Sequence, residues 1–157
     1  MLRFIALLAV MAGTVASSTE PGTGWLASSH PRVRIMFDMT LRPECRADCE
    51  RYDLLLAYRS SVPPAANELA EWRSFAEAGC VDLLLPGRKS FACREPGALA
   101  GTSKNGQQFA TSRFRIKRAD LEGLLAPSAT VRIQSLTLRL PAETRATLKE
   151  FLSGPIL

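Results

Sequence analysis

The sequence contains a single histidine, His30, among its 157 residues. One imidazole is too few for the histidine-rich ligand sets that hold zinc. His30 also precedes Pro31 in a stretch rich in serine, glycine and proline, so a Ser-His-Asp arrangement would depend on a loosely held residue. No spacing pairs two carboxylates for acid–base chemistry, since candidates such as Asp38, Asp53, Asp82 and Asp120 are scattered along the chain. We therefore expect no enzyme, no cofactor and no metal ion.

Long hydrophobic runs and phosphate-binding loops are also missing. Beyond residue 18, no segment approaches the roughly 20 apolar residues that a membrane-spanning helix needs. The glycine-rich segment 97–106 lacks the glycine-lysine-hydroxyl order of a phosphate loop. We therefore expect no transmembrane segment, and an ordinary surface loop at 97–106.

The N-terminus has the pattern of a targeting signal. Arg3 is followed by an apolar run over residues 4–12 and by small residues at 13–18. This order of positive charge, apolar core and small residues is typical of a secretory signal peptide. The sequence therefore predicts that residues 1–18 are a cleaved leader. Residues 19–157 are then one domain, exported to the periplasm or to the extracellular space.

Four cysteines lie beyond this leader, in the part of the chain that would reach an oxidising compartment. Four cysteines allow three pairings. A two-residue hairpin loop at 86–87 would place Cys80 opposite Cys93, at a narrow non-hydrogen-bonded position that suits a disulfide. Cys45 would then pair with Cys49. Because Pro-Gly is not the favoured two-residue hairpin loop, a longer loop with another pairing stays open.

Alternation with a period of two predicts the strands. It is clearest at residues 32–42, where apolar side chains at odd positions alternate with mostly polar ones, as in a strand with one buried face. A mobile loop is expected at 95–106, from its glycines and its Asn-Gly turn signal. Further strands are expected at 52–59, 80–85, 89–94 and 109–117.

Residues 130–140 are expected to form a last strand, whose apolar positions change from odd to even near Gln134 and Ser135. One extra residue there would keep both groups on the same face, which predicts a β-bulge. Helices are predicted at 65–78, 120–125 and 142–152. The pattern predicts a mainly β fold, an antiparallel β-sandwich with one or two appended helices. The alternative is an α+β fold with a single antiparallel sheet covered by helices.

The basic residues are mostly arginine, with sixteen arginines against four lysines and a net charge of +5. The guanidinium group binds carboxylates and phosphates in a bidentate manner. If their strands are neighbours, six outward basic residues would line one sheet face and attract anionic partners. These six are Arg32, Arg34, Arg113, Arg115, Lys117 and Arg132. Asp38 is interpreted as the ion-pair partner of a neighbouring arginine. No aromatic residue interleaves with the basic row, so we expect no nucleic-acid binding.

These observations predict a non-enzymatic exported binding module, of the assembly-factor, chaperone or inhibitor type. Its expected partner is a protein or an anionic envelope component. The alternative is a thiol-disulfide oxidoreductase that uses Cys45 and Cys49. Their spacing of three intervening residues differs from the two of thioredoxin-type sites, so the structural role is the leading interpretation.

Overall fold

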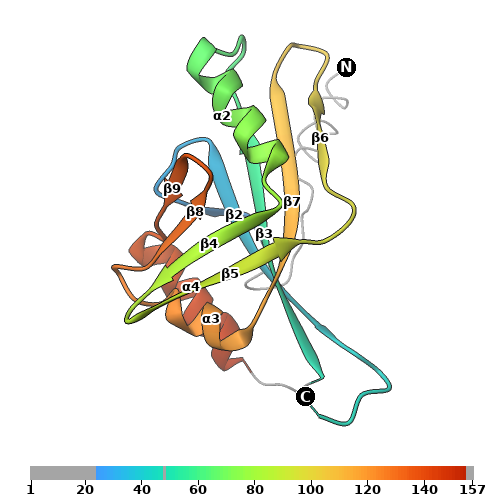
Figure 1. Cartoon of the computed structure of the whole chain (residues 1–157), viewed down its shortest axis with the longest axis vertical. Coiled ribbons are helices and arrows are strands. Elements are labelled where there is room, and N and C mark those ends of the chain that lie inside the picture. The colour runs from blue at the N-terminus through green and yellow to red at the C-terminus, as the bar shows by residue number, and fades with distance from the viewer. Residues whose placement is uncertain (1–23, 48, 155–157) are drawn as a thin grey trace, which may run out of the picture.

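The fold of this chain is mainly β. The computed structural model describes residues 24–47 and 49–154, which form nine strands and three helices (Figure 1). The strands are β1 (Leu26–Ala27), β2 (Val33–Leu41), β3 (Glu50–Arg59), β4 (Cys80–Leu85), β5 (Arg88–Arg94), β6 (Leu99–Thr102), β7 (Gln108–Ile116), β8 (Thr130–Ile133) and β9 (Leu136–Leu138). The helices are α2 (Ala66–Glu77), α3 (Arg118–Gly123) and α4 (Ala142–Ser153). The predicted leader at 1–18 lies outside the described residues.

All nine strands belong to one antiparallel sheet. Its order is β1-β2-β3-β7-β5-β4-β8-β9, and β6 pairs with β7 beside β5. The expected two-sheet sandwich is not confirmed, because the described strands form a single hydrogen-bonded sheet. The alternative expectation, a single antiparallel sheet covered by helices, agrees with this arrangement.

The sheet curls until its two ends meet. The Ser29 amide, just after β1, donates to the Arg139 carbonyl, just after β9, at 2.9 Å. Figure 1 shows α2 beside the upper part of the sheet, and α3 and α4 beside its lower part. None of the helices in the described residues is long and apolar enough to cross a membrane.

The concave face of the sheet carries the core, as the period-two pattern predicts. On β2, Val33, Ile35 and Phe37 are buried, and α4 packs Phe151 against Phe37 with ring centroids 6.1 Å apart. Leu41 is 51% exposed, because the end of the β2–β3 hairpin projects beyond the helices that cover the core (Figure 1). The predicted strand at 32–42 is therefore confirmed, but its buried face ends before Leu41.

The β4–β5 hairpin has the register that a two-residue loop predicts. Leu85 pairs with Arg88, and Cys80 pairs with Cys93, with which it forms a disulfide. The loop suits a Pro-Gly sequence, because Gly87 adopts a positive φ of 74°, which a glycine reaches without strain. The second disulfide, Cys45–Cys49, closes the loop between β2 and β3. Two disulfides indicate an oxidising environment.

Two sequence predictions are wrong in detail. Residues 130–140 do not contain a bulge: they form a hairpin, β8 and β9, in which Ile133 pairs with Leu136 across Gln134 and Ser135. A bulge and a two-residue turn both return apolar side chains to the same face, and no glycine or asparagine marked the turn. The expected loop at 95–106 contains β6, which adds to the edge of β7. The three helices are confirmed, each within two residues at its start.

Candidate functional site

The six predicted basic residues do not form one continuous row. Arg34 lies on β2, two strands away from Arg113 and Arg115 on β7, and Arg132 lies three strands beyond β7 on β8. Arg132 is also 3.6 Å from the carboxylate of Asp82. The flat basic face expected from the sequence is therefore divided between separate parts of the sheet.

Carboxylates neutralise the centre of this face. Asp38 and Asp53 are register partners on β2 and β3, and Nη1 of Arg113 lies 3.1 Å from Asp38 and 2.8 Å from Asp53. Nε of Arg51 is 3.5 Å from the other oxygen of Asp53, which is only 1% exposed. Burial opposes the charged form of Arg113, but its hydrogen bonds to the two aspartates outweigh burial and raise its pKa. The interpretation of Asp38 as an arginine partner is confirmed.

Arg32 turns away from the face toward α2. Its guanidinium binds the Glu71 carboxylate through Nε and Nη2, at 3.0 and 3.2 Å, and the hydroxyl of Tyr58 donates to the same carboxylate at 2.7 Å. The ring of His30 lies 3.4 Å from Glu71, so the one histidine belongs to this cluster. Burial favours the neutral form of Glu71, but the hydrogen bonds from Arg32 and Tyr58 prevail and lower its pKa.

The sheet splits between β5 and β7. These strands pair only where Cys93 meets Arg115 and Arg94 meets Phe114. From there β5 continues back to Arg88 beside β4, with Arg88 and Ser90 bonded to Asp120 of α3, while β7 continues along β3 and then turns into α3. Figure 1 shows β5 leaving β7 at an angle. The divergence of the two strands opens a fork in an otherwise continuous sheet.

A pocket of about 770 Å³ occupies this fork, and we call it the fork pocket. Six basic side chains line it against two carboxylates, with apolar and aromatic groups between them. The lining residues most relevant to charge are Arg42, Arg51, Arg94, Arg115, Lys117, Arg118, Glu50 and Glu95. A concave site with this excess of positive charge focuses an attractive field on anions.

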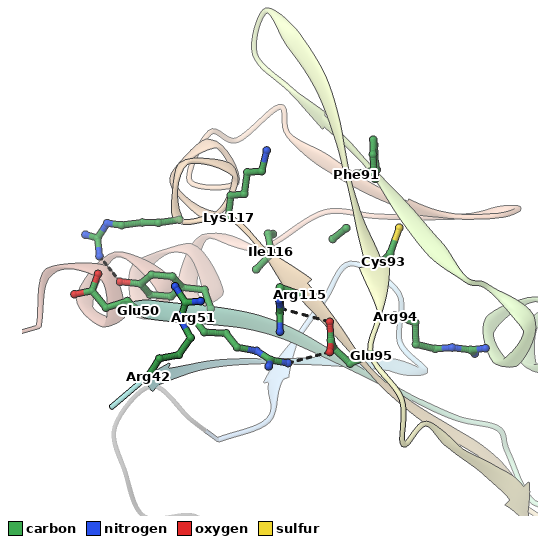
Figure 2. Close-up of a pocket in the computed structure, with 13 residues that line it drawn as sticks. Arg42, Glu50, Arg51, Phe91, Cys93, Arg94, Glu95, Arg115, Ile116 and Lys117 are labelled. Atoms are coloured by element: carbon green, nitrogen blue, oxygen red, sulfur yellow. Dashed lines mark hydrogen bonds and ion pairs between the residues drawn. The ribbon is translucent and has the colours of Figure 1, made fainter. Parts of the chain in front are cut away.

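Glu95 organises one side of the fork pocket. Its two carboxylate oxygens bind Arg51 at 3.1 Å and Arg115 at 3.5 Å (Figure 2). Lys117 is exposed, and within the described part of the chain it has no carboxylate partner. Its ammonium group is therefore available to an incoming anion.

Arg118 and Phe91 line two other parts of the pocket, on α3 and on β5. Arg118 donates to the Tyr52 hydroxyl and to the Leu152 carbonyl, both at 2.7 Å, and the bond to Tyr52 raises its pKa. Phe91 on β5 leaves 67% of its surface exposed at the pocket. Single exposed apolar residues are common, but this one stands beside a cationic cavity, so the pocket offers an anion site next to an apolar contact.

The sequence predicted two cations of this pocket, Arg115 and Lys117, but not the rest. Arg42 and Arg51 come from the β2–β3 hairpin and Arg118 from α3, so only the fold brings them to β5. No local pattern marked Phe91 as an exposed residue of this pocket, because its segment, 88–94, does not alternate regularly between apolar and polar residues. Arg32, Arg34, Arg113 and Arg132 do not line the pocket.

Comparisons with protein-family models, with curated proteins and with solved structures find no match for this chain. Within residues 24–47 and 49–154, no group of three His, Cys, Asp or Glu side chains is placed to hold a metal ion. The fork pocket is the candidate functional site, and its charge and shape carry the functional argument.

Proposed function

We propose that this protein is a non-enzymatic binding module of an exported, oxidising compartment, and that it holds an anionic partner in the fork pocket. The partner is a protein or another anionic component of the cell envelope. The observation that carries the proposal is the set of six cationic side chains around one cavity, against Glu50 and Glu95 in its lining and Glu122, which pairs with Arg118.

The pocket supports this proposal better than the flat sheet face does. Arg113 and Arg132 already have carboxylate partners within the fold, which reduces what they can offer to a ligand. Lys117 has no such partner in the described residues, and Arg115 shares its one carboxylate, Glu95, with Arg51. A concave site also removes more water from a bound anion than a flat face, which strengthens each charge contact.

Export is supported by the cysteine chemistry. Both disulfides are consistent with an oxidising compartment, and the N-terminal pattern of charge, apolar run and small residues is that of a secretory leader. We infer a periplasmic or extracellular location from these two features together.

Thiol-disulfide exchange at Cys45 and Cys49 is the second candidate. Nη2 of Arg42 lies 3.8 Å from Sγ of Cys45, and a neighbouring cation lowers the pKa of a thiol. This function requires that, after reduction of the folded protein, one of the two thiols titrates well below the ordinary pKa of about 8.5.

The pocket is tested by a matched pair of charge reversals, Lys117→Glu and Arg34→Glu. Both residues are exposed and without a carboxylate partner in the described chain, but only Lys117 lines the pocket. We expect Lys117→Glu to weaken binding of anionic probes by about tenfold, and Arg34→Glu by less than about twofold. The measurement is calorimetric titration with polyphosphate, with an acidic peptide and with phosphatidylglycerol vesicles.

Thermal unfolding of each variant provides the control for folding. No binding of any of the three probes to the wild-type protein would overturn the proposed function. Equal loss of binding in the two variants would place recognition on the overall charge of the protein and would exclude the pocket.

A further inference from the structure

We propose that the partner presents an extended acidic segment that adds as an antiparallel strand to the open edge of β5, inside the fork pocket. This inference rests on the proposed function, and it names the class of partner as a protein segment of alternating acidic and apolar residues.

The first support is the hydrogen-bonding pattern of β5. The Arg94 amide donates to the Gly79 carbonyl at 2.7 Å, so the adjacent pair, Cys80 and Cys93, is of the non-hydrogen-bonded kind. Because the two kinds alternate along an antiparallel ladder, the pair of Asp82 with Phe91 is also non-hydrogen-bonded. The main-chain N–H and C=O groups of Phe91 therefore point away from β4, toward the fork.

None of the described strands pairs with these groups, although the hydroxyl of the neighbouring Ser90 donates to Asp120 of α3. Extending the β5–β7 register by two residues from Cys93 and Arg115 would place Phe91 opposite Lys117, but the pairing ends before that position. Among the described residues, the Lys117 carbonyl instead accepts the Asp120 and Leu121 amides at the start of α3. An unpaired strand edge is a template for another extended chain.

The second support is the distribution of side chains around this edge. A strand opposite Phe91 places alternate side chains on the two faces of the sheet. Those on the convex face meet the Arg115 and Lys117 side, and those on the other face approach Ala92 and Ile116, which line the same pocket and are themselves largely buried. Acidic residues fit the first set and apolar residues the second.

A lipid headgroup or a free polyanion would use the charges but not the open edge. The main-chain donors and acceptors of Phe91 give a reason to favour a peptide, since backbone pairing supplies affinity and alternate side chains supply specificity. The proposed partner is therefore a protein, and the test shows whether the other anions bind instead.

The test uses the full chain and an eight-residue peptide of alternating aspartate and valine, blocked at both ends. In antiparallel addition the aspartates lie opposite Phe91 and direct their amides at β5. We expect N-methylation of the aspartate amides to weaken binding about tenfold or more, and N-methylation of the valine amides to change it by less than about threefold.

A second arm changes the protein. Phe91→Pro removes the open amide without removing a bond to β4, and Phe91→Ala keeps that amide but loses the ring. We expect Phe91→Pro to bind the peptide at least about fivefold more weakly than Phe91→Ala, because only the proline variant loses the amide. Circular dichroism and thermal unfolding show whether both variants fold. If Phe91→Pro does not fold, the N-methylated peptides alone test strand addition.

The outcomes separate the two proposals. If both N-methylated peptides bind as well as the parent peptide while Lys117→Glu still weakens binding, strand addition is overturned and the anion-binding pocket stands. If polyphosphate or phosphatidylglycerol vesicles bind and the peptide does not, strand addition is overturned as well. If none of these probes binds, both proposals fail.

Discussion

Replacement of Arg113 by methionine is expected to destabilise the protein by about 2 to 3 kcal/mol, because it leaves a buried carboxylate without its closest cation. Asp53 is 1% exposed, and its shortest ion pair is the 2.8 Å contact with Arg113. Arg51, at 3.5 Å from the other carboxylate oxygen, compensates only in part. The free energy of unfolding from urea titration measures the loss.

A double variant shows whether Arg113→Met is destabilising because the Asp53 charge is left without its cation, or because the packing of the Arg113 side chain is lost. Asp53→Leu together with Arg113→Met removes both charges, so we expect it to recover most of the stability lost in Arg113→Met. Arg132→Met is the matched control, since its partner Asp82 is 42% exposed and such pairs contribute less than about 1 kcal/mol. A double variant no more stable than Arg113→Met would contradict this account of the Asp38–Arg113–Asp53 group.

Replacement of Glu71 by glutamine is expected to cost about 2 kcal/mol at neutral pH, since charged hydrogen bonds from Arg32 and Tyr58 are lost or weakened. The pKa of Glu71 is lower in the folded protein than its ordinary value of 4.5. Its stabilising contribution is therefore fully present above the unfolded-state pKa and is lost as the pH falls through the folded-state pKa.

The difference in stability between wild type and Glu71→Gln should accordingly shrink as the pH is lowered from 7 to below 4. Urea unfolding at a series of pH values measures this difference. Glu122→Gln is the control, because Glu122 forms an exposed i,i+4 pair with Arg118 and should change stability by less than about 0.5 kcal/mol. A difference that stays constant across this range would show that Glu71 acts through packing.

The sequence predicted the parts of the fold that local patterns determine. Alternation located β2 and β7, and counting back from Pro86 and Gly87 correctly paired Cys80 with Cys93. The prediction failed where a bulge and a turn satisfy the same apolar pattern. Gln134 adopts a positive φ of 53° in a turn that no glycine marks.

The candidate site was less predictable, for a topological reason. Arg115 and Lys117 were identified because they alternate outward on one strand, but Arg42, Arg51 and Arg118 approach them only after β2, β3 and α3 have been placed. The fork itself depends on where β5 and β7 stop pairing, which periodicity does not specify. In the sequence Arg32 and Arg34 occupy equivalent outward positions. In the structure Arg32 faces α2 and binds Glu71, a contact between residues far apart in the sequence.

Mapping of amide chemical shifts during titration with the alternating aspartate–valine peptide tests the central claim most directly. If an anionic segment occupies the fork pocket, the largest shifts will fall on Phe91, Cys93, Arg115 and Lys117, and Arg34 and Arg132 will remain unchanged. Shifts centred on Arg34 or Arg132, or no shifts at a peptide concentration of several millimolar, would contradict it.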